Sequence, residues 1–322
     1  MTINMTVNIL SWLAIVAIAI LFGWLTWRAW KAKRAWVKWP GVILGGLLAL
    51  IIGLVSVITL IGLVKLYGPR DAPIPDLKVA GTAEQIQRGE YLANSFCTEC
   101  HSVTNQLPLT GGIDLGKDIP LPLGTFVSVN LTPAGPLKDW SDGEIMRALR
   151  NGIDRDGRWL IGMSNVRVRN MSDEDLEAVI AYLRSQPAVV NETQNPPDQP
   201  NLLAAFMLGA GLLPEGQPPI TGVITAPSKG PTAEYGQYII GYQDCRDCHG
   251  EDLNGGIEGQ LAPVGPSLKV AKGWTQEGFI TTLRTGVDPS GHTLSDQMPW
   301  KALGRMNDED LTAMYEYLVT LP

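Results

Sequence analysis

The stretch SFCTECHSV, residues 95–103, decides the fold because it places two thiols and an imidazole within one helical turn of each other. A second stretch, YQDCRDCHG at 242–250, repeats the same C-x-x-C-H spacing. The residues concerned are Cys97, Cys100 and His101 in the first cluster and Cys245, Cys248 and His249 in the second. These are all the cysteines of the chain, so one chemistry has to explain both pairs.

Three chemistries use a C-x-x-C spacing. A zinc site needs four ligands in one cluster, whereas each cluster here has three adjacent candidates and its twin lies far along the chain. A thioredoxin-like redox pair needs a βαβ context, and the surrounding sequence predicts helices and loops. Covalent haem needs two thiols one turn apart for the thioether bonds and a histidine directly after them for the iron. The sequence therefore predicts two covalently bound haem c groups, with His101 and His249 as iron ligands.

A longer internal repeat surrounds the two clusters. WSDGEIMRALRNGID at 140–154 matches WTQEGFITTLRTGVD at 274–288, and MSDEDLEAVIAYLRSQP at 171–187 matches MNDEDLTAMYEYLVTLP at 306–322. Ser172 and Asn307 are expected to cap the closing helices, and Thr82 with Gln85 forms the pattern of a capping box. Each repeat therefore predicts an opening helix, the cysteine cluster, a long loop, a second helix, a methionine loop and a closing helix.

The repeat also selects candidates for the sixth iron ligand, for which methionine is the common alternative to histidine. Met163 and Met298 lie in equivalent loops, eight residues before Met171 and Met306 respectively. The latter pair directly precedes the capping residues, where an apolar side chain packs as a hydrophobic staple. We therefore predict Met163 and Met298 as ligands. Residues expected to have other roles are Met146 and Met314 as core residues and His292 as a surface residue.

A backbone carbonyl is expected to fix each histidine ring by accepting its Nδ1–H, which also raises the basicity of the ligand. GPSL at 265–268 predicts that the carbonyl of Pro266 does this for His249. The first repeat has no such motif in the corresponding stretch, and Pro122 in LPLG is the nearest candidate for His101.

The first seventy residues have a different character. Ile9–Trp27 and Gly41–Val64 are free of charged residues. A spanning helix needs roughly 20 apolar residues; the first run comes close to this length and the second exceeds it. The loop between them is basic, which predicts a cytoplasmic loop and places everything after Tyr67 on the extracytoplasmic (periplasmic) side of the cell membrane. Five tryptophans form an aromatic belt near this loop: Trp24, Trp27, Trp30, Trp36 and Trp39. A soluble helical hairpin is the alternative interpretation.

These patterns predict four segments. Residues 1–70 form a two-helix membrane anchor, 71–187 a first cofactor domain, 188–231 a Pro-rich linker and 232–322 a second cofactor domain. Within the linker, the apolar run 202–213 is too short to span a bilayer. It is expected to pack against the first cofactor domain, while contact with the membrane or with a partner subunit is the alternative.

Charge restricts the choice of partners. Residues 1–70 contain seven Lys or Arg and no Asp or Glu, which leaves 18 basic and 32 acidic side chains in 71–322. Such an acidic part is a poor candidate for nucleic-acid binding, which requires basic contacts to phosphates. It favours a basic soluble redox protein as an electrostatically steered partner, although the same charge also serves solubility.

Around the cysteine clusters the chain resembles class I cytochrome c, twice over. LPLGTFVSVNLTP, WSDGEIMRALRNGIDRDGRWL and MSDEDLEAVIAYL in the first repeat are similar to the cytochrome c subunits of membrane-bound alcohol and gluconate dehydrogenases. This resemblance implies a small all-α fold around each haem. Together with the N-terminal apolar runs it predicts an all-α chain, in which a transmembrane helical hairpin precedes two class I cytochrome c-like domains. It also implies His/Met ligation and electron transfer without substrate chemistry.

The expected function is electron relay by a membrane-anchored dihaem cytochrome. The predicted partners are the lipid bilayer and a membrane-bound donor or acceptor complex in a respiratory or photosynthetic chain. One alternative is an enzyme, either a peroxidase or a thiosulfate-oxidising cytochrome, in which one haem opens a coordination position. Others are a cytochrome subunit of a dehydrogenase complex and a structural subunit of a larger assembly.

Overall fold

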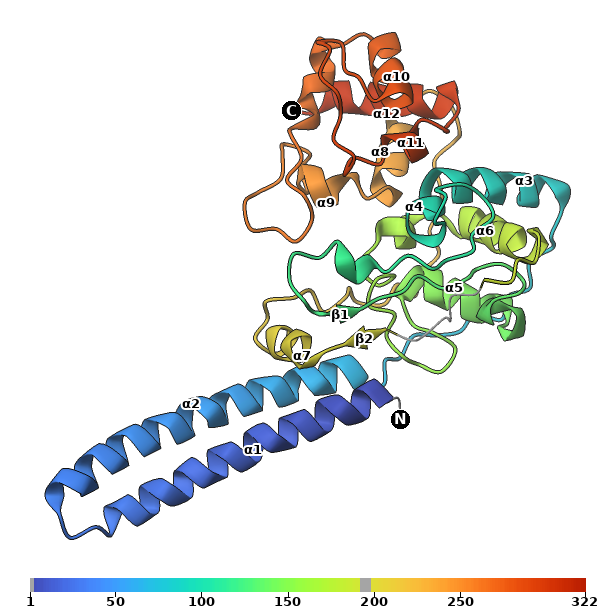
Figure 1. Ribbon diagram of the computed structural model, residues 1–322. Helices are drawn as coiled ribbons and strands as arrows, with labels where there is room; N and C mark the ends of the chain where they lie inside the picture. The colour runs from blue at the N-terminus through green and yellow to red at the C-terminus, as the bar shows by residue number, and fades with distance from the viewer. Residues whose placement is uncertain (1–2, 192–197) are drawn as a thin grey trace. The chain divides into compact units, whose positions relative to one another are not determined.

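The computed structural model describes residues 3–191 and 198–322, which are almost entirely helix and loop (Figure 1). The all-α class predicted from the sequence is confirmed, with one pair of two-residue strands among the described residues. The α-helices are α1 Ile3–Trp30, α2 Ala35–Tyr67, α3 Ala83–Leu92, α4 Thr98–His101, α5 Asp142–Asn151, α6 Asp173–Ser185, α7 Leu202–Gly209, α8 Ala233–Tyr242, α9 Cys245–His249, α10 Gln276–Thr285, α11 Trp300–Leu303 and α12 Asp308–Thr320. The strands are β1 Gly124–Thr125 and β2 Gln199–Pro200. A π-helical turn, η1 Ala93–Cys97, joins α3 to α4, and 3-10 turns are η2 Leu115–Lys117, η3 Pro136–Asp139, η4 Arg167–Asn170 and η5 Leu268–Gly273.

The chain forms two compact units. One consists of the residues up to Arg70 together with Leu121–Phe126 and Asp198–Gly216, and the other contains both cysteine clusters. Part of the segment predicted as a linker thus belongs to the same unit as the N-terminal hairpin.

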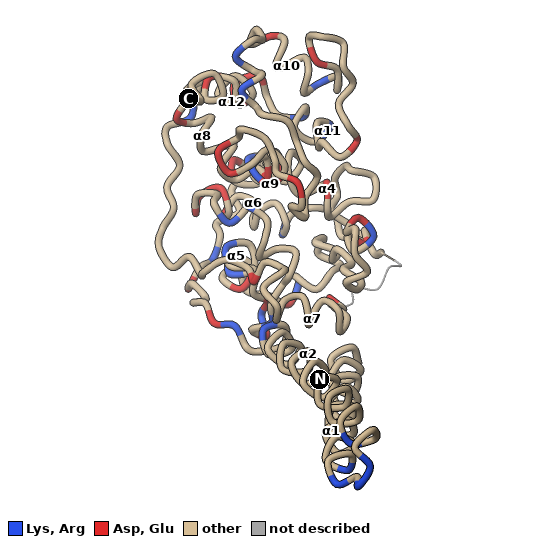
Figure 2. The backbone as a smooth tube through the Cα atoms, turned by 90° about the vertical axis from the view of Figure 1, so that its left-hand side faces the viewer, with Lys and Arg blue, Asp and Glu red and all other residues tan. Residues whose placement is uncertain are grey.

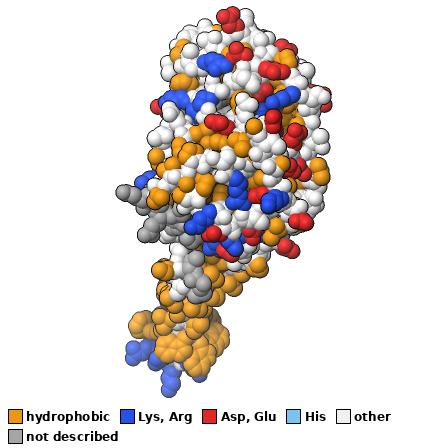
Figure 3. All heavy atoms as spheres, turned by 90° about the vertical axis from the view of Figure 1, so that its right-hand side faces the viewer, with side chains coloured by type: hydrophobic (Ala, Val, Ile, Leu, Met, Phe, Trp, Pro, Cys, Tyr) orange, Lys and Arg blue, Asp and Glu red, His pale blue; other side chains and the backbone are white. Residues whose placement is uncertain are grey.

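In the first unit, α1 and α2 form an antiparallel hairpin. Both helices are long and apolar enough to cross a membrane, and most of their side chains are exposed. The two backbones approach closely where α2 has glycine: a Cβ on Gly41 would lie 2.7 Å from Cβ of Ala29. Figure 3 shows an apolar surface along the hairpin, as expected for helices whose solvent is lipid.

The turn of the hairpin carries the basic residues (Figure 2). Aromatic side chains pack on them. Nζ of Lys31 lies 3.6 Å from the ring centroid of Trp27, and Nζ of Lys38 lies 4.3 Å from that of Trp30. Such cation–π pairs are stable at a membrane–water boundary, where ring faces are apolar and the ammonium groups stay hydrated. The aromatic residues therefore lie next to the basic loop, as the sequence predicts.

The apolar segment 202–213 contains α7, which packs on α2 rather than on the first cofactor domain as expected. A Cβ on Gly62 would lie 1.7 Å from the carbonyl oxygen of Ala205, and a Cβ on Gly209 would lie 1.9 Å from that of Ile58. Glycine on both helices lets the backbones touch, and this close fit decides where the segment packs. On α1, the buried Asn8 adds a polar tie, because its Nδ2 donates to the carbonyl of Pro200 at 2.7 Å.

In the second unit, each repeat pairs its opening helix with its closing helix, α3 with α6 and α8 with α12. The predicted caps are present: Ser172 and Asn307 accept from the amides three residues on, and Thr82 forms a full capping box with Gln85. A glycine stands at each crossing. A Cβ on Gly89 would lie 1.9 Å from the carbonyl oxygen of Ala178, and one on Gly236 would lie 1.8 Å from that of Ala313.

We expect Gly236→Ala to destabilise the second repeat by about 1–3 kcal/mol, because the added methyl group forces the two helices apart. Gly241→Ala, in the same helix, is the matched control, since a Cβ there meets no atom of the described residues within 4 Å. Chemical denaturation followed by circular dichroism measures both. Equal stability of the two variants would show that the crossing is not tightly packed.

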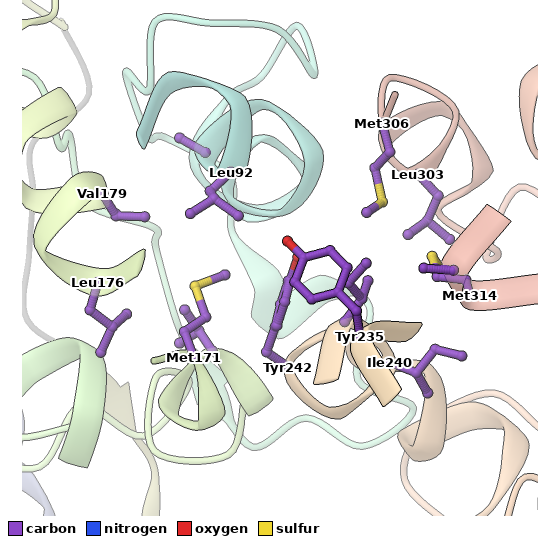
Figure 4. Close-up of a cluster of buried hydrophobic side chains, with 14 of the residues drawn as sticks. Leu92, Met171, Leu176, Val179, Tyr235, Ile240, Tyr242, Leu303, Met306 and Met314 are labelled. Carbon is purple, nitrogen blue, oxygen red and sulfur yellow. The ribbon is translucent and has the colours of Figure 1, made fainter. Parts of the chain in front are cut away.

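The buried side chains of both repeats form one continuous cluster (Figure 4). Met171 and Met306 are fully buried within it, as expected for residues that pack beneath the closing helices. Met146 and Met314 are also buried, which confirms their assignment to the core. Figure 4 shows Tyr235 and Tyr242 between side chains of the two repeats. The second unit is therefore one packed body with two cysteine clusters.

Candidate cofactor-attachment sites

The first cluster lies where η1 passes into α4. Cys97 ends the π-helical turn, and Cys100 and His101 follow within α4, so the helix sets both sulfurs and the imidazole one turn apart. Nδ1 of His101 lies 3.0 Å from the carbonyl oxygen of Val129. Gly111 allows this carbonyl to reach the ring region: its φ is +65°, and a Cβ there would come within 2.4 Å of Val129.

The prediction that Pro122 fixes the His101 ring is wrong. Val129 supplies the carbonyl, while the carbonyl of Pro122 accepts from Nδ2 of Asn201 at 2.6 Å. Pro122 and Asn201, like the whole segment Leu121–Phe126, belong to the unit that contains the hairpin. No motif in the sequence marks Val129, because any residue has a backbone carbonyl and only the path of the loop selects this one.

The second cluster lies on α9, which carries both cysteines and His249. Nδ1 of His249 lies 2.6 Å from the carbonyl oxygen of Pro266, so the hydrogen bond predicted from GPSL is present. Gly265 makes the approach possible, since a Cβ at that position would lie 2.7 Å from the same Nδ1. The amide of Gly265 also donates to the carbonyl of Cys248 at 2.8 Å, which ties the loop to the helix.

The other ring nitrogen of His249 indicates what the site holds. Nε2 is buried, and within the described part of the chain it has no hydrogen-bond partner. A buried polar nitrogen without a partner is costly, and metal coordination satisfies it. Burial lowers the pKa of His249, and also that of His101, so both rings are neutral and can offer a lone pair near neutral pH.

The pKa values of the thiols are shifted in the opposite direction from those of reactive cysteines. Burial raises the pKa of Cys97 and of Cys245 to about 12, and that of Cys100 to about 11. Redox-active thiols need a lowered pKa, because the thiolate is the reacting form. Among the residues that the structure describes, no group of three or more His, Cys, Asp or Glu is placed to hold a metal ion directly. Attachment of haem c by thioether bonds fits these sulfurs better than zinc or disulfide chemistry.

Met163 and Met298, the predicted sixth ligands, are half-buried and pack against the same apolar cluster as Cys97 and Cys245. They therefore differ from Met171 and Met306, whose side chains are completely enclosed. His292 is exposed, and its backbone amide donates to the carboxylate of Asp288, as expected for a turn residue at the surface. Iron ligation by the two methionines stays a prediction.

A search against protein-family models finds that the family described as cytochrome c oxidase, cbb3-type, subunit III matches residues 84–183 and 231–318. The chain is 26% identical over 270 residues to the cytochrome c subunit of gluconate 2-dehydrogenase from Pantoea cypripedii, covering 73% of this chain and 59% of that one. It is 26% identical over 270 residues to the cytochrome c subunit of alcohol dehydrogenase (quinone) from Gluconobacter oxydans, covering 74% and 55% respectively.

A diheme cytochrome c-type protein from Cereibacter sphaeroides is 37% identical over 112 residues, covering 33% of this chain and 37% of its own. The chain spans little more than half the length of the two dehydrogenase subunits. The resemblance predicted from the sequence is confirmed, both in the domain type and in the similarity to these dehydrogenase subunits.

Proposed function

The chain belongs to the cytochrome c family described as cytochrome c oxidase, cbb3-type, subunit III, and from this premise we propose that it is a membrane-anchored dihaem electron carrier. It accepts electrons from a membrane-bound complex and passes them to an acceptor on the extracytoplasmic side. The observation that supports this most directly is the repeated arrangement of a helical C-x-x-C-H motif whose histidine Nδ1 lies at a backbone carbonyl.

Each haem c, when bound, supplies a one-electron couple between ferric and ferrous iron. Cys97 with Cys100, and Cys245 with Cys248, would hold the two groups by thioether bonds. His101 and His249 would offer Nε2 to the iron, while the carbonyls of Val129 and Pro266 keep each ring in the Nδ1–H tautomer. Met163 and Met298 would supply the remaining ligands and favour a high reduction potential. Iron held by a histidine and a methionine would have no free ligand position for a substrate, which favours a carrier over an enzyme.

The hairpin supports the assignment of partners. Its apolar surface fits a bilayer. One of the similar proteins is the cytochrome c subunit of an alcohol dehydrogenase named for a quinone, which supports a partner that handles electrons in a complex. We infer a membrane-bound donor or acceptor complex as the main partner, with a basic soluble redox protein as a further acceptor for the acidic second unit.

The decisive experiment is haem analysis of the purified full chain. Pyridine haemochrome analysis is expected to give two covalent haems per chain, and the reduced protein is expected to bind carbon monoxide poorly. One haem per chain, or haem that acid acetone extracts, contradicts the dihaem proposal. Rapid carbon monoxide binding to one haem favours the peroxidase or thiosulfate-oxidising alternative.

The proposed topology has its own test. A reporter enzyme that is active only outside the cytoplasm, fused after Pro322, is expected to be active, because the basic loop between α1 and α2 stays on the cytoplasmic side. The same reporter inserted into that loop, at Lys33, is the matched control and is expected to be inactive. The reverse pattern of activity would contradict the extracytoplasmic location of the haem domains.

A further inference from the structure

The two repeats meet through a reciprocal pair of tyrosines, one on each opening helix. Tyr91 on α3 and Tyr238 on α8 each stand two residues after the glycine that packs on the closing helix of the same repeat. Residues two apart on a helix face different directions. The tyrosines therefore turn away from their own closing helix and reach that of the other repeat.

Each tyrosine binds the same two groups in the other repeat. The hydroxyl of Tyr91 donates to Oδ2 of Asp310 at 2.6 Å and accepts from the amide of Asn307 at 3.2 Å. The hydroxyl of Tyr238 donates to Oδ2 of Asp175 at 2.6 Å and accepts from the amide of Ser172 at 2.9 Å. Asn307 and Ser172 are the equivalent N-caps of α12 and α6, so the contact obeys a pseudo-two-fold relation between the repeats.

The two carboxylates are buried and the hydroxyl–carboxylate bonds are charge-assisted, which makes these bonds strong and directional. Asp310 is 1% exposed and Asp175 is 6% exposed. Burial and the neighbouring carboxylates raise the pKa of Tyr91 and of Tyr238, so both phenols remain protonated donors. Removing either hydroxyl would leave a buried carboxylate with fewer partners.

Arg88 breaks the symmetry at the centre of this contact. Its Nε and Nη2 form a bidentate pair with Asp175 at 2.8 and 3.0 Å, and Nη2 also donates to the hydroxyl of Tyr235 at 3.1 Å. Nη1 lies 3.9 Å from Oδ2 of Asp310, so one guanidinium serves carboxylates of both repeats. Tyr235 occupies the position equivalent to Arg88. A single guanidinium between two carboxylates is satisfied in one arrangement of the two repeats, so it favours that arrangement over others.

The same interface reaches the cysteine clusters from both sides. Arg305 of the second repeat donates to Oγ1 of Thr98 at 2.5 Å, and Thr98 lies between the two cysteines of the first cluster. Arg167 of the first repeat donates from Nε to Asp247 at 2.7 Å, and Asp247 lies between the two cysteines of the second cluster. Each repeat thus holds the haem-attachment turn of the other.

We propose that Tyr91, Tyr238 and Arg88 are positioning residues that hold the two haem-attachment turns in one orientation, so that electrons pass between the haems within a single chain. This inference rests on the proposed dihaem function. It allows the donor and the acceptor to bind different repeats, because an electron delivered to one haem reaches the other without a second encounter. Transfer moves one electron from ferrous iron of one repeat to ferric iron of the other, with no other reactant.

The test compares Tyr91→Phe/Tyr238→Phe with Tyr315→Phe in the full chain in detergent. The double variant removes only the two hydroxyls of the interface. Tyr315→Phe removes a hydroxyl of the same kind that bonds the carbonyl of Trp274 at 2.8 Å within the second repeat. All proteins carry Met163→His, so that the methionine–iron charge-transfer band belongs to the second haem alone. A ruthenium photosensitiser on Lys138→Cys, an exposed position in the first repeat, injects the electron.

After the flash, loss of the charge-transfer band reports arrival of the electron in the second repeat. The parent and Tyr315→Phe are expected to show the same rate at all protein concentrations. The double variant is expected to be slower by about tenfold to a hundredfold, because small displacements of reacting partners have effects of that size. Its haem content and the potential of each haem are expected to match those of the parent, which separates positioning from damage to the haem sites.

A rate in the double variant within about twofold of the parent overturns the inference, since catalytic positioning effects are larger than this. A parent with two haems but no intramolecular phase also overturns it while leaving the haem-binding assignment intact. A parent without haem contradicts the proposed function itself.

Hydrogen exchange of the amides of Ser172 and Asn307 gives a second measurement. Faster exchange in the double variant supports the contact, and unchanged exchange contradicts it even if electron injection fails.

Discussion

Replacing Cys245 and Cys248 by alanine is expected to halve the covalently bound haem, from two groups per chain to one. Both thioether bonds of the second site are lost, while Cys97 and Cys100 keep their own helix turn and the carbonyl of Val129 for His101. Pyridine haemochrome analysis of the purified protein measures the change. The mirror variant, Cys97→Ala with Cys100→Ala, is the matched control and is expected to retain the other haem.

Both variants are also expected to affect stability. Because both repeats share one apolar cluster, loss of one haem is expected to lower the thermal stability of the whole second unit, in addition to that of one repeat. A variant that loses both haems at once would show that attachment in one repeat requires the other. A variant that keeps both would contradict thioether attachment.

Met298→His is expected to remove the methionine–iron charge-transfer band of one haem and to lower its reduction potential. A nitrogen ligand stabilises the ferric state relative to a thioether, and axial ligands control potentials over a range of roughly 0.8 V. Redox titration with near-infrared detection measures both quantities. Met163→His is expected to have the same effect on the other haem.

The controls are the second pair of methionines that the repeat places in equivalent positions. Met171→Leu and Met306→Leu are expected to leave both bands in place, because these side chains are enclosed in the apolar cluster and pack beneath helices α6 and α12. Loss of a band in either control would contradict the assignment of ligands. If the unsubstituted protein has a single band and one haem binds carbon monoxide, the enzyme alternative replaces the carrier at that haem.

Much of the fold follows from local chemistry that a sequence displays directly. The caps at Thr82, Ser172 and Asn307 depend on residues three positions apart, and all three are present. The C-x-x-C-H spacing works in the same way, since a single helical turn brings its three side chains together. The carbonyl of Pro266 was predictable too, because a proline turn marks the place where the chain comes back to the histidine.

Other features depend on which distant surfaces fit one another. Only the tertiary structure decided these features. Val129 is the carbonyl at His101 because the loop after Gly111 returns there, and a carbonyl has no sequence signature. The segment 202–213 packs on α2 because glycines on both helices allow contact between backbones. Tyr91 and Tyr238 sit in equivalent positions of the repeat, yet nothing in that equivalence says that each binds the other repeat. Local spacing is set by bond geometry along the chain, whereas the pairing of surfaces depends on the free energy of packing between segments far apart in sequence.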